Sequence, residues 1–283
     1  MSVFEQMLSR YEIRQDNDKR NATFEVMQEI ALAGLYRGGF FNKAAFYGGT
    51  CLRIFHGMER FSEDMDFSLL MPDSNFKLDN YFPSIVNEFD AAGRKVVISK
   101  KEKRIPGRIE SAFLKDNTEI FNLSFQTEKS IRIKIEVDVY PPLEFATEQK
   151  LLLNPFSFMT RCFVLSDLFA GKIHALVFRS WKNRVKGRDW SDFEWFIRKG
   201  INLNFNHLQA RIRQINGLEM SNEEFMHKLK ERLLNTDIEI VKQDVKPFIK
   251  NTDELEIWSK EYFLQLAEMI KFTPSPGLDR RIF

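Results

Sequence analysis

Cysteine is nearly absent from the 283-residue sequence, which contains only Cys51 and Cys162. Neither belongs to a Cys-x-x-Cys motif or to a Cys/His pattern with metal-ligand spacing, which argues against a zinc site. No stretch reaches the roughly 18 apolar residues that a membrane helix needs, and residues 1–17 lack the apolar core of a secretory signal. We therefore expect a protein of the reducing cytoplasm with no membrane segment.

An excess of charge of either sign is also missing. The sequence has 42 lysines and arginines against 40 aspartates and glutamates, a formal net charge of +2. Nucleic-acid binding would therefore have to come from a local basic patch rather than from global basicity. The hydrophobic fraction of 43% is ordinary for a globular protein, and the length allows one large domain or two modest ones.

Strand patterns dominate the first half of the sequence. Residues 130–140 give the clearest strand, because isoleucine or valine occupies every odd position from 131 to 139 and charged residues occupy the even positions between them. Further strands are predicted at 44–47, 65–70, 95–99 and 121–126, and helices at 19–37, 50–56 and 78–92.

Helical patterns dominate after residue 155. We predict helices at 166–179, with Ser166 as the N-cap, at 189–198 and at 254–270, and a capping box formed by Ser221 and Glu224. The sequence therefore predicts an α+β fold. Strands with flanking helices would fill residues 1–155, and a mostly helical C-terminal domain would fill residues 156–283.

Two aspartates two residues apart, Asp64 and Asp66, are the first candidates for chemistry. In a strand they would project from the same face, where paired carboxylates can hold the Mg²⁺ or Mn²⁺ ions of a phosphoryl-transfer site. Upstream, Gly48-Gly49 leads into a short helix whose free N–H groups suit an anion, and Thr50 and Ser62 add hydroxyl groups. The competing interpretation is a solvated strand face.

A third carboxylate could come from the strand at 130–140, where Glu136 and Asp138 share the polar face with Lys134. Either could complete a metal site if this strand neighbours the one with Asp66. The alternative, favoured by the strand pattern alone, is the solvent face of an antiparallel sheet.

Several charged residues of the second half are further candidates. Lys172 and Arg179 are seven residues apart on one helix and share a face, so they could clamp a triphosphate or simply be solvated. Asp189 and Asp192 open the next helix, where its dipole stabilises acids. A basic, aromatic-flanked segment precedes them and could contact an RNA backbone. Its cations are Lys182, Arg184, Lys186 and Arg188.

The order of these motifs resembles that of the AbiEii/AbiGii toxin family of nucleotidyltransferases. The resemblance rests on Gly-Gly-Thr at 48–50, Arg-Phe-Ser-Glu-Asp-Met-Asp at 60–66, Leu-Phe-Ala-Gly-Lys at 168–172 with Arg179, and Arg-Asp-Trp-Ser-Asp at 188–192. It implies a nucleotidyltransferase-like mixed β-sheet flanked by helices, followed by a helical domain that contributes to the site. It also implies that Ser62 contacts triphosphate, Asp64 and Asp66 bind metal, Lys172 holds phosphates and Asp189 acts in or beside the active site.

The resemblance further implies a toxin that transfers NMP from an NTP to RNA, with tRNA as the expected acceptor, in a bacterial toxin–antitoxin or phage-defence system. The expected partner is an antitoxin encoded alongside. Two alternatives stay open: NMP transfer to a protein hydroxyl, and a non-catalytic scaffold that binds a partner. The intact Ser62, Asp64, Asp66, Lys172 and Asp189 argue against the scaffold.

Overall fold

The computed structural model describes residues 1–100, 118–126, 131–179, 185–249 and 251–274. The chain forms two compact units. The first comprises Met1–Leu143 with Thr147–Phe163, and the second comprises Glu144–Ala146 with Val164–Phe283. Because the final strand of the sheet ends at Phe163, the first unit extends past residue 155, where the sequence analysis placed its boundary.

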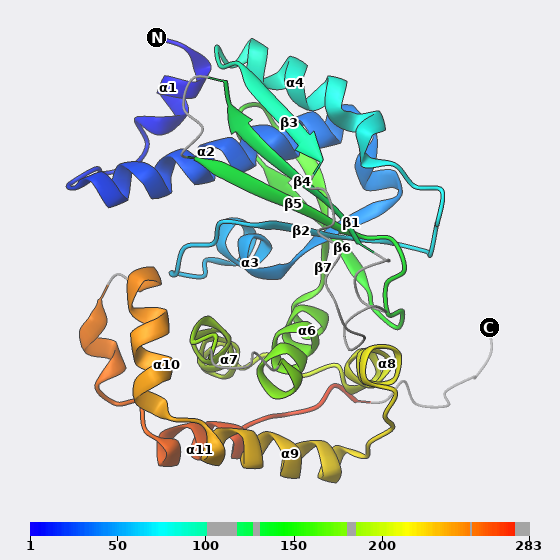
Figure 1. The fold of residues 1–283 in the computed structure, drawn as a ribbon, viewed down its shortest axis with the longest axis vertical. Helices are drawn as coiled ribbons and strands as arrows, with labels where there is room; N and C mark the ends of the chain where they lie inside the picture. Colours follow the sequence, from blue (N-terminus) through cyan, green and yellow to red (C-terminus); the bar gives the residue numbers. More distant parts are fainter. Residues whose placement is uncertain (101–117, 127–130, 180–184, 250, 275–283) are drawn as a thin grey trace, which may run out of the picture. The chain divides into compact units, whose positions relative to one another are not determined.

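A seven-stranded mixed sheet forms the frame of the first unit, in the order β3-β4-β5-β2-β1-β7-β6 (Figure 1). The central strand β2 pairs antiparallel with β1 and parallel with β5. The strands are β1 (Ala44–Tyr47), β2 (Met65–Leu69), β3 (Val96–Lys100), β4 (Thr118–Phe125), β5 (Arg132–Asp138), β6 (Thr147–Leu152) and β7 (Phe158–Phe163).

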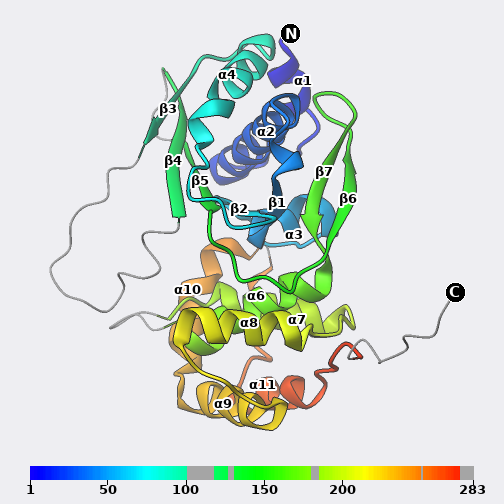
Figure 2. The same ribbon diagram turned by 90° about the vertical axis from the view of Figure 1, so that its right-hand side faces the viewer.

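Helices α2 and α4 pack side by side in this unit (Figure 2). Gly34 permits their close contact, because a Cβ at this position would lie 2.6 Å from Ile85 Cα. Arg37 and Glu88 then link the two helices through an ion pair of 2.6 Å. The helical elements are α1 (Val3–Leu8), α2 (Asp16–Arg37), η1 (Phe40–Asn42), α3 (Gly48–His56), η2 (Leu78–Tyr81) and α4 (Phe82–Ala91).

The predicted strands and helices of this unit are confirmed, but the sequence analysis missed β6 and β7. Strand β6 is the sheet's outer strand, and its sequence from Thr147 to Lys150 is polar, so it lacks the apolar alternation of a half-buried strand. Strand β7 does alternate between buried and exposed residues up to Cys162. It is short and follows Pro155, which the sequence analysis interpreted as the start of the helical region.

The second unit is helical, and α6 and α7 form its centre. Phe169 of α6 stacks on Phe196 of α7 with ring centroids 4.6 Å apart. Figure 1 shows α9 and α11 running beside each other in the same unit. The elements are α6 (Leu165–Phe178), α7 (Arg188–Arg198), α8 (Phe205–Asn216), α9 (Asn222–Asn235), α10 (Ile238–Val245), η3 (Lys246–Phe248), η4 (Thr252–Leu255) and α11 (Lys260–Glu268).

The caps of these helices test the sequence predictions directly. The capping box of Ser221 and Glu224 is confirmed, whereas the N-cap of α6 is Val164, so the prediction of Ser166 is wrong. The single helix predicted at 254–270 is also wrong, because η4 ends at Leu255 and Ser259 caps a new helix by accepting a hydrogen bond from Tyr262 N. Within the described residues, no helix is long and apolar enough to cross a membrane.

Candidate active site

Two glycines, Gly48 and Gly49, form a closely packed turn between β1 and α3. Helix α3 begins at Gly48, whose φ of +83° favours glycine. A Cβ at Gly48 would lie 2.3 Å from Asp66 Oδ2, and one at Gly49 would lie 2.7 Å from Ser62 Oγ. The turn therefore has no space for side chains at these two positions, because a carboxylate and a hydroxyl lie directly against the two glycines.

Asp66 lies at the centre of the sheet. It is opposite Tyr47 on β1 and opposite Glu136 on β5. Asp64 immediately precedes β2, which begins at Met65, and its carbonyl accepts a short hydrogen bond from the Thr50 hydroxyl. Both aspartates are half-buried. The structure thus brings Gly48, Gly49, Thr50, Ser62, Asp64 and Asp66 together, as the sequence motifs predict.

Lys134 on β5 lies in the electrostatic field of these carboxylates. Its Nζ is 2.6 Å from Glu136 Oε1. Burial alone would lower the pKa of Lys134. The negative charges of Glu136, Asp64 and Asp66 have the larger effect, and the pKa of Lys134 lies above its ordinary value. The three carboxylates therefore create a region where positive charge is favoured. Sequence analysis noted Lys134 without giving it a role.

The two candidates for a third metal ligand differ in position. Glu136 is in register with Asp66, whereas Asp138 lies two residues further along β5 and accepts a hydrogen bond of 3.1 Å from Tyr140 N. Among the described residues, no three His, Cys, Asp or Glu side chains form a group that could hold a metal ion. The oxygen donors of Asp64 and Asp66, in a region that favours positive charge, fit a hard divalent cation.

Two ion pairs connect α6 to α7 in the second unit. Lys172 Nζ lies 2.8 Å from Asp192 Oδ2, and Arg179 Nη1 lies 3.0 Å from Asp189 Oδ2. Burial raises the pKa of Asp189 above its ordinary value, although Arg179 and Lys172 oppose this shift. The shared face predicted for Lys172 and Arg179 is therefore turned towards α7. Asp192, for which no role was predicted from the sequence, is fully buried beside Lys172.

The segment before α7 is also densely charged. Burial and then the charge of Arg179 lower the pKa of Lys186 to about 8, and the Arg188 guanidinium stacks 4.3 Å from the centre of the Phe248 ring. Lys182 and Arg184 lie outside the described residues. Because a neighbouring cation lowers the pKa of Lys186, an anion bound there would relieve electrostatic repulsion.

Gly187 opens α7 in close contact with α10. A Cβ there would lie 2.2 Å from Val241 O and 2.9 Å from Val245 N. Its backbone N–H donates to Asp244 Oδ2 at 2.8 Å. The position of the α7 start, and with it that of Asp189, therefore depends on α10.

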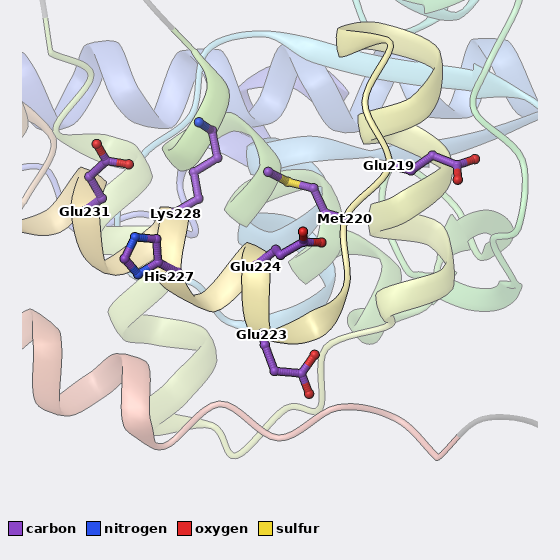
Figure 3. Close-up of a pocket in the computed structure, with 7 residues that line it drawn as sticks. All are labelled: Glu219, Met220, Glu223, Glu224, His227, Lys228 and Glu231. Atoms are coloured by element: carbon purple, nitrogen blue, oxygen red, sulfur yellow. The ribbon is translucent and has the colours of Figure 1, made fainter.

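One further feature shares no residue with these clusters. A shallow hollow of about 470 Å³ lies along α9 and the segment before it (Figure 3), and four glutamates line it together with Met220, His227 and Lys228. None of the site residues named above contributes to it.

Arg60, by contrast, is buried near the site: its Nη2 would lie 3.1 Å from a Cβ at Gly49. The sequence analysis quoted Arg60 without assigning it a function.

Comparison with known proteins gives a family and a fold. The family model "Nucleotidyl transferase AbiEii toxin, Type IV TA system" matches residues 30–282. The chain is similar to JHP933 of Helicobacter pylori, with a TM-score of 0.52 and 16% identity over 88% of this chain and 90% of that one. It is also similar to the nucleotidyltransferase toxin MenT4 of Mycobacterium tuberculosis, with a TM-score of 0.50 and 14% identity over 94% and 98%.

These comparisons agree with the motifs. At such low identities the two solved structures support the fold alone, and no curated protein sequence matches the chain. The family match, by contrast, spans both units and includes the segments with Asp64, Lys172 and Asp189. The chain belongs to the AbiEii family of nucleotidyltransferase toxins of type IV toxin–antitoxin systems.

Proposed function

We propose that this toxin transfers a nucleoside monophosphate from an NTP to a hydroxyl of RNA, with tRNA as the acceptor. The observation that carries the proposal is the turn of Gly48 and Gly49, against which the Asp66 carboxylate and the Ser62 hydroxyl lie. Backbone N–H groups at a helix start, together with a hydroxyl, bind phosphate oxygens, and the adjacent carboxylates supply metal ligands.

Asp64 and Asp66 are the residues that would hold a divalent cation, Mg²⁺ or Mn²⁺. The raised pKa of Lys134 supports this assignment, because the same carboxylates already stabilise a positive charge there. Glu136 is the better candidate for a third ligand, since it is in register with Asp66 and Asp138 is not. When bound, the cation would neutralise charge on the triphosphate and on the leaving pyrophosphate.

The remaining site residues would neutralise phosphate charge and accept the proton of the acceptor hydroxyl. In the reaction, the acceptor oxygen bonds to the α-phosphorus while the bond from that phosphorus to the bridging oxygen breaks, and pyrophosphate leaves. Lys172 and Arg179 would compensate the negative charge of the phosphates. Asp189 would accept the proton of the acceptor hydroxyl, a role supported by its raised pKa. The helical domain would thus contribute Lys172 and Asp189 to catalysis.

The choice of RNA rests on the basic segment before α7. Lys186 and Arg188, with Lys182 and Arg184 in the same stretch of sequence, would contact RNA phosphates. Family membership implies an NTP substrate and a cognate antitoxin. A role in phage defence is part of the same proposal. A small winged-helix regulator encoded directly upstream would support the toxin–antitoxin arrangement.

The proposal is tested with each of the four α-labelled NTPs, Mg²⁺ or Mn²⁺, and total tRNA. We expect labelled tRNA with the wild type and none with Asp64→Ala. Asp90→Ala is the matched control, because Asp90 is an exposed aspartate on α4 and should leave labelling unchanged. Label that runs with protein would overturn the RNA acceptor, and no label with any NTP would overturn transferase activity.

A further inference from the structure

The segment that carries Ser62 and Asp64 has no regular secondary structure. Residues 57–64 connect the end of α3 to the start of β2 without helix or strand hydrogen bonds. Its carbonyl groups must therefore find other partners, and these partners determine how the backbone is oriented. We call residues 58–64 the serine–aspartate loop.

Side chains bind nearly every carbonyl of the serine–aspartate loop. Arg53 Nη1 donates to Met58 O at 3.0 Å and to Glu59 O at 2.8 Å. Arg60 Nη1 donates to Phe61 O at 3.1 Å. The carbonyls of residues 62 and 63 accept from Gln28, and that of residue 64 accepts from the Thr50 hydroxyl. The loop is thus held by side chains at six of its seven carbonyls.

Gln28 differs from the other donors in its origin. It comes from α2, whereas Arg53 and Thr50 belong to α3, the helix that leads into the loop. Its amide Nε2 donates to Ser62 O at 2.9 Å and to Glu63 O at 3.1 Å, so both N–H groups are used. The side chain is fully buried, and its Oε1 has no hydrogen-bond partner among the described residues.

A glutamine in this position is unfavourable for packing alone. A buried acceptor without a partner destabilises the folded state. An apolar side chain of similar size would avoid that cost, but it would leave the carbonyls of residues 62 and 63 without this donor. Gln28 also lies two residues before the stretch matched by the family model, which begins at residue 30. The placement of Gln28 is therefore explained by its two donated hydrogen bonds, which hold the loop.

We propose that Gln28 is a positioning residue, which holds the serine–aspartate loop so that Ser62 lies against the glycine turn and Asp64 keeps its place directly before β2. The inference rests on the proposed function for its effect on catalysis. Without the Gln28 amide, the carbonyls of residues 62 and 63 lose their donor, and rotation of these peptide planes would move both side chains. Precise placement of such groups matters, because small displacements cost large factors in rate.

The first test needs no enzymatic activity. Hydrogen exchange is measured on peptides covering residues 58–66 in the wild type, in Gln28→Met and in Gln209→Met. Gln209 is the matched control because its Nε2 also donates to a loop carbonyl, Met220 O at 3.2 Å, in the second unit. We expect roughly tenfold faster exchange in this segment for Gln28→Met only, as expected for local opening. Unchanged exchange would overturn the proposal.

The second test uses kinetics and a variant that can regain a donor. In Gln28→Glu, the neutral carboxyl can donate one hydrogen bond, whereas the carboxylate would repel both carbonyls. We expect kcat to fall by about tenfold or more in Gln28→Met with a smaller change in KM. For Gln28→Glu we expect activity, relative to the wild type, to recover as the pH falls. An equal loss at every pH would count against positioning by hydrogen bonds.

The two tests separate this inference from the proposed function. If the wild type transfers no nucleotide, the proposed function fails, but the exchange measurement still decides whether Gln28 holds the loop. If Gln28→Met does not fold, exchange in Gln28→Glu at acidic and neutral pH takes its place. The exchange rates of Gln28→Glu in residues 58–66 are divided by those of the wild type at the same pH, which removes the intrinsic pH dependence. A lower ratio at acidic pH supports the proposal, and equal ratios at both pH values refute it.

Discussion

The ion pair between Lys172 and Asp192 predicts that stability and activity can be separated by mutation. Asp192 is fully buried, and the Lys172 side chain is only 18% exposed. Lys172→Met would leave the buried carboxylate without this cation, and breaking a buried pair costs about 3–5 kcal/mol. Asp192 keeps other interactions, so we expect the lower end of that range, about 3 kcal/mol in the free energy of unfolding.

Removing the carboxylate charge as well should restore stability but not function. In the double variant Lys172→Met with Asp192→Asn, the buried charge is gone and its shape is kept, so we expect about 2 kcal/mol to return. Nucleotide transfer should stay lost, because the proposed role of Lys172 is to compensate phosphate charge. A purely structural lysine would instead give recovery of both properties.

The assay is urea unfolding followed by circular dichroism, with NMP transfer measured on the same samples. Lys230→Met provides a control, since Lys230 pairs with Glu268 at 2.6 Å but both side chains are more exposed. It should cost less than about 1 kcal/mol. The reasoning is refuted if the double variant is no more stable than Lys172→Met, or if it regains transfer activity.

Three further predictions concern the turn and two titrating groups. Gly48→Ala should abolish activity measured by NMP transfer, because its Cβ would displace Asp66 Oδ2; activity near the wild-type level would contradict this. Burial lowers the pKa of His174 from 6.5 to about 3. As the pH falls below about 6.5, the unfolded state therefore binds a proton that the folded state does not, and the free energy of unfolding decreases. By pH 4 the loss is about 3 kcal/mol, and a His174→Gln variant should show a shallower decline in urea unfolding. The pKa of Lys186 is lowered to about 8, so this side chain should bind a proton when an NTP binds near pH 9. Calorimetry of NTP binding in two buffers of different ionisation enthalpy measures this proton uptake. Equal uptake in Lys186→Met would rule this group out.

The parts of the site that are close in sequence could be predicted from it. Gly48, Gly49, Ser62, Asp64 and Asp66 lie within one turn, one loop and one strand, so local patterns sufficed to group them. Their proposed chemistry was inferred from residue type, because a glycine turn suits phosphate and paired carboxylates suit divalent cations. The α+β class was predicted for the same reason, from period-two strands and helical stretches, whereas the mixed sheet was predicted from the family resemblance.

Contacts between distant elements were not predictable. Periodicity showed that Lys172 and Arg179 share a face, but not that Asp192 and Asp189 would be their partners, because a helix pattern does not specify its neighbour. Gln28 is the clearest case. A single glutamine in a helix gives no signal in the sequence, and its role depends on hydrogen bonds to carbonyls 34 and 35 residues away.

The close contact of Gly187 with α10 has a consequence for how such a toxin can be inactivated. The start of α7 rests on the backbone of Val241 and is held by the carboxylate of Asp244. A stop codon, frameshift or protease cut ahead of α10 would remove that support while leaving the sequence from Gly48 to Asp192 intact. We therefore expect escape mutants selected against toxicity to include truncations shortly before residue 238, where α10 begins, far in sequence from Asp64 and Asp66.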